Sequence, residues 1–353
     1  MRDLKNFIDT PAEWLNNTGA HADIVISTRV RLARNLEGIP FTNCAKEPEI
    51  NKVIAEVSNA VKNNSYLTNA TMIDLSQVNN LVKQFLVERH LISRELAENR
   101  KGMVFVGDKE MINIMVNEED HLRIQTFSSG LEPVRTWQMI NQVDNELAKS
   151  LKYAYSSNWG YLTACPTNVG TGMRTSVMIH LPALDITKQL RKILHAISQV
   201  GLAIRGLYGE GTEALGDFFQ ISNQVTLGRS EEEITENIGK ITNQIIGHEQ
   251  KAREVLMKEN RIQLEDQILR AYATLAYARI ISSKEALELL SLVRLGAGIG
   301  LIKEVSLKVI NELLVLSQPA NVQLLAGEVL SNPARDVKRA IIIQQKLFRK
   351  KTK

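Results

Sequence analysis

The spacing of apolar residues divides the chain into two parts. Residues 1–250 mix stretches that alternate with the period of a strand and stretches with the period of a helix. From about residue 251 onward the period is almost entirely helical. The composition changes near Glu249–Glu254, where we expect the boundary between a mixed domain and a helical domain.

The first part is expected to form an α+β domain over residues 23–250, in which an antiparallel sheet is flanked by helices. Residues 1–22 begin with MRDLKNFIDTPAEWL, which predicts a short amphipathic helix that packs through Trp14. Residues 251–353 are expected to form an α-helical C-terminal domain, a small bundle.

Local signals place helices in the C-terminal part. Ser282 followed by Glu285 predicts a capping box at a helix start. Pro319 is expected to end an apolar helix, and Asn332–Pro333 to supply the N-cap and the first-turn proline of the last helix. The stripe predicted for one helix comprises Leu264, Ile268, Ala271, Leu275 and Ile280.

Several expected strands have an apolar face and a polar face, because side chains alternate along a strand. The polar positions carry arginine but no lysine. A solvent-exposed face of an antiparallel sheet shows the same alternation, although such a face normally carries both residue types. The expected polar faces comprise Ser27, Arg29 and Arg31; Glu119, His121, Arg123 and Gln125; Arg174, Ser176, Met178 and His180; and Gln220, Ser222, Gln224 and Thr226.

Arginines in and beside these strands indicate a site for a polyanion. Arginine meets phosphate oxygens with a planar, bidentate fork, and a buried charge needs an anionic partner. Cationic stabilisation and positioning supply most of the catalysis of phosphoryl transfer. The sequence contains neither a GxxxxGK[ST] loop nor the HRD and DFG motifs of protein kinases. The arginines expected to converge on one anionic ligand are Arg29, Arg31, Arg123, Arg174 and Arg205.

Further segments contain residues suited to chemistry. The acidic run Asn117–His121 precedes a strand, where a plain acidic turn is the alternative. In Cys165–Gly172, nearby arginines would favour the thiolate of Cys165, whereas free cysteine is otherwise often a small buried apolar residue. The glycine-rich stretch Gly206–Thr212 includes Glu210 and is either a lid or an ordinary surface loop.

Composition narrows the class of protein. A net charge of +4 with 44% hydrophobic and 23% charged residues is ordinary for a globular protein. The arginines do not form the basic, aromatic-interleaved stripe typical of nucleic-acid binding. With no membrane-length apolar run and no signal sequence, we expect a cytoplasmic protein without nucleic-acid or membrane partners. Cys44 and Cys165 are too few for a disulfide framework or a zinc site, so no protein-bound metal is expected.

The chain contains, in order, STRVRLARN (27–35), HLIS (90–93), NEEDHLRIQ (117–125), CPTNVGTG (165–172), RTSVM (174–178) and RGLYGEG (205–211). In sequence and order these motifs resemble those of the phosphagen (guanidino) kinase family. The resemblance covers roughly residues 23–250, and the acidic and cysteine motifs together are highly specific. The chain departs from the family pattern at Thr175, where alanine is more frequent, and at Arg94, where proline is usual.

The order of domains resembles one branch of that family. Members that act on small guanidines, the creatine and arginine kinases, have a helical domain before the first arginine motif. Here 22 residues precede Asp23, and a helical domain follows instead. This layout, with YGEG in the loop and RDxxRA near the end, resembles the bacterial protein-arginine kinases. The resemblance implies ATP-dependent phosphorylation of arginine side chains in proteins, which gives Nω-phosphoarginine.

The resemblance also assigns roles by motif position. Glu119 is the implied catalytic carboxylate, Glu210 the second carboxylate on the guanidinium, and Cys165 its thiolate partner. Mg²⁺ is implied because it bridges the β- and γ-phosphates of ATP. The residues implied to bind ATP are Ser27, Thr28, Arg29, Val30, Arg31, His90, Arg123, Arg174, Thr175, Ser176, Val177, Met178, Arg205, Gly206, Leu207, Tyr208, Gly209 and Glu210.

The chemistry of arginine is consistent with a pair of carboxylates. The guanidinium pKa lies above 12, so removal of its proton at pH 7 costs about 7–9 kcal/mol. Carboxylates beside the group favour its cation. We therefore expect Glu119 and Glu210 to align the guanidinium and to accept its proton only as the N–P bond forms.

Near the end of the chain, Arg335, Asp336 and Arg339 lie within one turn of an expected helix start. Two arginines and the helix dipole suit a phosphate, and Asp336 suits a guanidinium. From spacing alone, a self-satisfied ion-pair cluster on a solvated surface is an equal alternative. In the family, the motif is interpreted as an allosteric phosphoarginine site; its residues here are Arg335, Asp336, Val337, Lys338, Arg339 and Ala340.

The resemblance further implies a homodimer, a zinc-binding activator protein, and substrates that include a heat-shock repressor and proteins destined for a Clp protease and its unfoldase. Stress response and protein quality control are the implied setting. Two other functions stay open: a kinase for free arginine or another small guanidino compound, and a non-catalytic phosphoarginine reader. The presence of both Glu119 and Glu210 argues against the reader, because a binding module needs no paired carboxylates.

Overall fold

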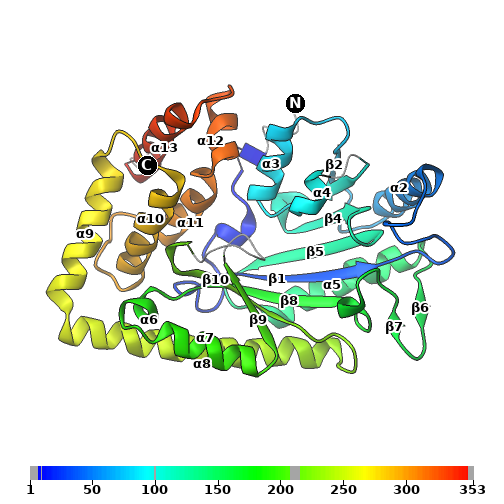
Figure 1. Ribbon diagram of the computed structural model, residues 1–353, viewed down its shortest axis with the longest axis horizontal. Coiled ribbons are helices and arrows are strands. Elements are labelled where there is room, and N and C mark those ends of the chain that lie inside the picture. Colours follow the sequence, from blue (N-terminus) through cyan, green and yellow to red (C-terminus); the bar gives the residue numbers. More distant parts are fainter. Residues whose placement is uncertain (1–6, 9, 99–100, 207–214, 349–353) are drawn as a thin grey trace.

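An eight-stranded antiparallel sheet forms the centre of the molecule (Figure 1). The computed structural model describes residues 7–8, 10–98, 101–206 and 215–348. Strands β6 (Tyr155–Ser156) and β7 (Gly160–Tyr161) form a separate small hairpin. In order across the sheet the strands are β2 (Thr71–Asp74), β3 (Met103–Val106), β4 (Ile112–Val116), β5 (Leu122–Ser129), β1 (Val25–Arg34), β8 (Met173–His180), β10 (Phe218–Asn223) and β9 (Leu202–Gly206).

Helices flank this sheet and make up the C-terminal part of the chain, which confirms the expected fold class. The α-helices are α2 (Glu47–Lys62), α3 (Asn80–Glu88), α4 (Arg94–Glu98), α5 (Pro133–Ala148), α6 (Pro182–Ile186), α7 (Leu190–Gln199), α8 (Glu231–Glu259), α9 (Arg261–Tyr277), α10 (Ser283–Gly298), α11 (Leu307–Leu316), α12 (Pro319–Ala326) and α13 (Asn332–Leu347). Short 3₁₀ helices are η1 (Glu13–Leu15), η2 (Asp108–Glu110), η3 (Pro166–Asn168) and η4 (Leu215–Asp217).

The two-faced pattern of the central strands positions the core. Val30 and Leu32 of β1 and Ile124 of β5 are fully buried, and they belong to one cluster with Ile140 and Val143 of α5. Because successive side chains of a strand point to opposite faces, Arg29 and Arg31 lie on the other side of the sheet. Arg34 stays on the α5 side, where it pairs with Asp144. The apolar face thus fixes the orientation of the polar face.

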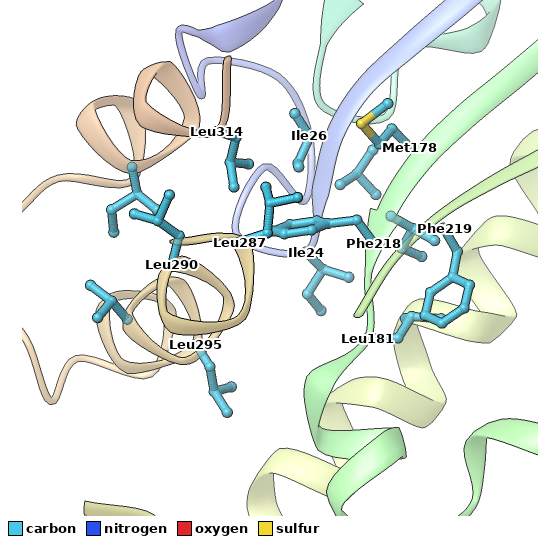
Figure 2. Close-up of a cluster of buried hydrophobic side chains, with 14 of the residues drawn as sticks. Ile24, Ile26, Met178, Leu181, Phe218, Phe219, Leu287, Leu290, Leu295 and Leu314 are labelled. Atoms are coloured by element: carbon cyan, nitrogen blue, oxygen red, sulfur yellow. The ribbon is translucent and has the colours of Figure 1, made fainter. Parts of the chain in front are cut away.

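The helical C-terminal part shares a core with the sheet. Phe218 of β10 lies in one buried cluster with Leu287 of α10 and Leu314 of α11 (Figure 2). Helix α8 continues without a break through residue 250, so the change in composition falls inside one helix. Continuous helix and apolar packing therefore join the two parts.

The helix signals in the sequence are only partly correct. The capping box is confirmed, because Ser282 Oγ accepts a hydrogen bond from the backbone N–H of Glu285 at 3.2 Å. Pro319, however, begins α12 rather than ending α11. Proline has no backbone N–H, but the first turn of a helix leaves that group unpaired, so proline is tolerated there. The N-cap of α13 is Ser331, one residue before the predicted Asn332.

The predicted apolar contacts are also confirmed in part. Trp14 is buried at 3% exposure in η1, although residues 1–6 and 9 of the expected N-terminal helix lie outside the described residues. The predicted stripe of α9 is buried except for Ile280, which is 62% exposed because the helix ends at Tyr277. Within the described residues, no helix is both long and apolar enough to cross a membrane.

Candidate active site

The arginines that the sequence predicts to bind an anion share the polar face of the sheet. Arg31 of β1 lies directly opposite Gln125 of β5 on one side and Arg174 of β8 on the other. Opposed residues of antiparallel strands have side chains on the same face. Arg123 precedes Gln125 by two residues and therefore shares this face as well. Non-sequential strand order thus brings together arginines that are distant in the sequence.

A second row of polar residues extends this face toward the sheet edge. Arg29 lies opposite Ser176 and donates a hydrogen bond from Nη2 to Oε1 of Gln220 at 2.8 Å. Gln220 in turn lies opposite Arg205 on β9. All the arginines predicted to converge on an anion therefore lie on one face of one sheet.

A small cavity lies on this face beside Arg29. Two of its lining residues, Phe127 and Gln220, were not among the predicted site residues. Arg29 lies over the Phe127 ring, with 5.7 Å between the guanidinium carbon and the ring centroid. The period of two that links Arg123 to Gln125 continues to Phe127, and it could have identified this residue. The predicted residues that line the cavity are Ser27, Arg29, His90, Ser176 and Met178.

Four residues predicted to bind ATP have side chains on the opposite, apolar face. Val30 and Val177 are fully buried in the core. Thr28 donates a hydrogen bond from Oγ1 to the backbone oxygen of Gly130 at 2.7 Å, and Thr175 is fully buried. Strand alternation forces this outcome, because a contiguous motif in a strand contributes every second side chain to one face. Only their backbone atoms remain available to a ligand on the arginine face.

The arginine cluster disfavours its own charge in the absence of an anion. Burial, then the charges of Arg123 and Arg205, lower the pKa of Arg29 to about 9. Burial, followed by the charges of Arg29, Arg123 and Arg174, lowers the pKa of Arg31 well below its ordinary value. Among the described residues, Nε of Arg31 is buried without a hydrogen-bond partner. These features fit a polyanionic ligand such as a triphosphate, which would offset the repulsion.

His90 adds a neutral donor or acceptor to the cavity. Burial, then the charges of Arg29 and Arg31, lower the pKa of His90 to about 3. Its backbone has φ of 60°, and its carbonyl oxygen accepts a hydrogen bond from Nε2 of Gln125 at 2.6 Å. The Trp14 ring lies edge-on to His90, with 5.8 Å between ring centroids. Contacts from Gln125 and Trp14 thus fix the position of His90.

The acidic turn lies beside the arginine cluster. Glu118 forms an ion pair with Arg123. Burial is the largest single effect on Glu118 and opposes its ionisation. The charge of Arg123 and hydrogen bonds from Ser93 and the backbone of Glu119 together outweigh burial and lower the pKa of the carboxyl. Glu119 is exposed, and its pKa is raised first by partial burial and then by the charges of Asp120 and Glu118. A hydrogen bond with Cys165 opposes this shift. A carboxyl with a raised pKa is a better proton acceptor than an ordinary one.

Asp120 positions the cysteine loop. Its Oδ1 accepts hydrogen bonds from the backbone N–H of Ala164 at 2.7 Å and from Nδ2 of Asn35 at 2.6 Å. The Asp120 carboxylate therefore supports the turn, whereas Glu119 remains available to a substrate. The sequence motif did not separate these two roles.

The cysteine loop is connected to the arginine cluster. Sγ of Cys165 lies 3.0 Å from Oγ1 of Thr167, which accepts a hydrogen bond from Nη2 of Arg174 at 3.1 Å. Cys165 is only partly buried, so it is not a core residue. Gly172, at φ of +65°, is required nearby, because a Cβ atom there would lie 2.7 Å from the backbone oxygen of Ala33.

The glycine-rich loop is described only at its start. Arg205 and Gly206 are the last residues of β9. The predicted site residues Leu207, Tyr208, Gly209 and Glu210 lie outside the described residues. Among the residues that are described, no group of three or more histidine, cysteine or acidic side chains is arranged to hold a metal ion.

The RDxxRA motif lies in the first half of α13, remote in sequence from the other motifs. Arg339 is 1% exposed and forms an ion pair with Asp336. Arg339 also donates hydrogen bonds to backbone oxygens of Ser317 at 2.6 Å and Ile281 at 2.8 Å. Arg335 is half-buried and hydrogen-bonded to Asn332. Val337 is exposed, Lys338 is half-buried and Ala340 is buried.

Comparison with known proteins identifies the class of protein to which this fold belongs. The model of the ATP:guanido phosphotransferase C-terminal catalytic domain matches residues 52–252. Among solved structures, the duplicated taurocyamine kinase of Schistosoma mansoni aligns with a TM-score of 0.60 and 28% identity over 66% of this chain and 34% of that one. A lombricine kinase aligns with a TM-score of 0.58 and 25% identity over 68% of this chain and 71% of that one. The fold and site thus define an ATP:guanidino phosphotransferase.

The C-terminal part narrows the assignment. Residues 261–353 match the model of the C-terminal domain of protein-arginine kinase McsB. The protein-arginine kinase of Brevibacillus brevis is 48% identical over 350 residues, 97% of each chain. That of Symbiobacterium thermophilum is 47% identical over 340 residues, 95% of this chain and 96% of the other. Within the class, the chain belongs to the protein-arginine kinase family.

Proposed function

We propose that this protein transfers the γ-phosphoryl group of ATP to arginine side chains of other proteins. One observation carries the proposal: arginines from four strands share one sheet face beside a turn where Glu119 contacts Cys165. In the reaction, an N–P bond forms on the guanidinium as the bond between the β,γ-bridging oxygen and the γ-phosphorus breaks. ADP leaves, and the guanidinium proton passes to a carboxylate.

ATP is proposed to bind along the arginine face. Arg31, Arg123, Arg174 and Arg205 supply fixed positive charge for the phosphates, together with the residues that line the cavity beside Arg29. Thr28, Val30, Thr175 and Val177 would contribute backbone atoms only. Mg²⁺ would be held mainly by the β- and γ-phosphates, which is its usual mode in phosphoryl transfer.

Glu119 is proposed to align the substrate guanidinium and to accept its proton as the N–P bond forms. Its exposed position beside Cys165 and its raised pKa support this role. The predicted second carboxylate, Glu210, is proposed from its motif position alone. Cys165 would contact the guanidinium beside Glu119, where a negatively charged sulfur would favour the cation as the carboxylate does.

Protein arginine, rather than free arginine, is the proposed substrate. The observation that supports this choice is near-full-length similarity to protein-arginine kinases, including the C-terminal domain. We infer the same biological setting as the sequence motifs imply: a cytoplasmic enzyme of the stress response that modifies a heat-shock repressor and marks proteins for a Clp protease and its unfoldase. A zinc-binding activator protein is a proposed partner.

Regulation by phosphoarginine is proposed at the RDxxRA motif. Arg335 at the start of α13 would meet the phosphate, and Asp336 the guanidinium. Arg339 would act by holding Asp336 in place, because its own side chain is buried. A homodimer is proposed as well, supported by exposed apolar residues around α9 and α13. They include Tyr277, Ile280 and Phe348.

The decisive experiment is intact-mass analysis after incubation with Mg-ATP at neutral pH, because the P–N bond is labile in acid. Free arginine and an unfolded, arginine-containing protein are offered side by side. We expect mass increases on the protein and little phosphorylation of the amino acid. Phosphorylation of free arginine alone would support the small-guanidine kinase. Binding of phosphoarginine without any transfer would support the reader.

A further inference from the structure

The carboxylate of Glu88 caps the first turn of α12. Glu88 ends α3 and is 3% exposed. Its oxygens accept hydrogen bonds from the backbone N–H of Ala320 at 2.9 and 3.0 Å, from the backbone N–H of Asn321 at 3.0 Å, and from Nδ2 of Asn321 at 2.9 Å. Because the N-cap residue Gln318 makes no side-chain cap, an anion from a distant segment takes that role.

The same segment leads directly into the candidate nucleotide cavity. Arg89 is 2% exposed and donates a hydrogen bond from Nε to Glu110 at 2.8 Å. His90, the next residue, lines the cavity and has a backbone conformation with positive φ. Glu88, Arg89 and His90 are thus each held by a different part of the molecule. A shift of Glu88 would displace His90 two residues away.

The RDxxRA motif contacts the residues just before α12. Ser317 lies two residues before α12, and its backbone oxygen accepts the hydrogen bond from Nε of Arg339. Arg339 is paired with Asp336. The motif and Glu88 therefore hold the same short segment, Ser317–Asn321, from opposite ends.

We propose that Glu88 is a positioning residue that couples the start of α12 to the nucleotide cavity through His90. It touches neither nucleotide nor reacting atoms. Its role is to keep the His90 segment in the conformation that binds ATP, and it makes nucleotide affinity depend on how α12 is held. This inference rests on the proposed function, because it takes ATP to be the ligand of that cavity.

The test compares Glu88→Gln with a matched control. Glutamine keeps the volume but removes the charge, and its single oxygen cannot serve every donor of α12. The control is Glu312→Gln, which changes a buried carboxylate on α11 that pairs with Lys346 on α13. Affinity for Mg-ATP is measured by calorimetry on the full chain, and kcat is measured at saturating ATP. The free energy of unfolding of each variant is measured in urea, so that a change in ATP affinity can be separated from a loss of stability.

Glu88→Gln is expected to raise the Kd for Mg-ATP about fivefold or more, which is the lower range of typical coupling between sites. At saturating ATP, kcat should change less than about twofold, because the reacting groups are untouched. Glu312→Gln should leave the Kd unchanged. An unchanged Kd in Glu88→Gln, or an equal rise in the control, overturns the proposal.

A second variant keeps the test valid if Glu88→Gln fails to fold. Asn321→Ala removes one donor from α12 and leaves Glu88 intact. It should raise the Kd for Mg-ATP although Asn321 lies outside the cavity. Where both variants fold, their double mutant should show a non-additive effect on Kd. Additive effects, or wild-type affinity in Asn321→Ala, overturn the coupling.

Failure of this inference is distinguishable from failure of the proposed function. Unchanged ATP affinity in Glu88→Gln, with normal arginine phosphorylation by the wild type, refutes only the role of Glu88. Absence of arginine phosphorylation by a wild type that binds Mg-ATP refutes only the kinase proposal.

Discussion

Arg31 and Arg174 lie directly opposite each other on the adjacent strands β1 and β8. Like charges at opposed positions of antiparallel strands destabilise a sheet. Burial adds to this cost, as the lowered pKa of Arg31 shows. A triphosphate would turn the repulsion into attraction by placing negative charge between the guanidinium groups. The arrangement therefore sacrifices stability of the free protein for binding.

Two arginines of the same strand should respond in opposite ways to substitution by methionine. Arg31→Met removes an uncompensated buried charge, so the free energy of unfolding should stay the same or rise by about 1 kcal/mol or more. Arg34→Met breaks the buried pair with Asp144 and should cost about 3–5 kcal/mol. Urea unfolding measures both effects. In a nucleotide titration, Arg31→Met should weaken Mg-ATP binding at least about thirtyfold.

Glu119→Gln should retain ATP binding and lose phosphoarginine formation by about 10²–10⁴-fold, because an amide cannot accept the guanidinium proton. Intact-mass analysis at neutral pH and a nucleotide titration measure the two properties. Glu254→Gln, at an exposed position of α8, is the control and should match the wild type. Wild-type turnover in Glu119→Gln would refute the proposed role.

Cys165→Ser should reduce kcat with protein substrate by about tenfold or more, because a hydroxyl does not ionise near neutral pH and cannot supply a negative charge to the guanidinium. The exposed Cys44 offers a matched control, and Cys44→Ser should leave the rate unchanged. If both serine variants turn over at the wild-type rate, the thiolate role is wrong.

His90 should destabilise the protein in mild acid. Its pKa is about 3 in the folded chain and near 6.5 when unfolded, so only the unfolded chain takes up this proton in between. The contribution of neutral His90 to the free energy of unfolding is complete above pH 6.5 and is lost as the pH falls toward 3. By pH 5 the loss is at most about 2 kcal/mol.

The histidine effect is measurable as a difference between variants. His90→Asn keeps a residue that tolerates positive φ. Urea unfolding near pH 7 and near pH 5 should show a smaller drop in stability for His90→Asn than for the wild type. His248→Asn, at an exposed position, should show the wild-type drop. Equal drops in all three proteins would contradict the assignment.

Asp336→Ala should abolish binding of free phosphoarginine, because the proposed site loses its guanidinium partner. The variant also releases Arg339 from its ion pair, so unfolding must be measured in parallel. Arg335→Gln leaves that pair intact and should weaken phosphoarginine binding with little loss of stability. Wild-type affinity in both variants would remove the site and leave a structural ion pair.

The sequence alone determined which residues share a face of each strand and which chemistry they suit. Side-chain alternation is a property of the local backbone, so Arg29 and Arg31 were predictable as neighbours on one polar face. The same rule, applied to each position, would have separated Val30 and Thr175 from the ligand side. Helix ends were less predictable, as Pro319 shows, because one proline is compatible with the end of one helix and the start of the next.

Only the tertiary structure decided which strands and segments meet. The order β5-β1-β8-β10-β9 places Arg123 near Arg31 and Gln220 opposite Arg205, and nothing in the local pattern specifies this pairing. Glu88 reaches Ala320 across 232 residues of sequence. Such contacts depend on the packing of whole elements, since the free energy that selects them comes from the shared core and from the hydrogen bonds that α12 cannot satisfy alone.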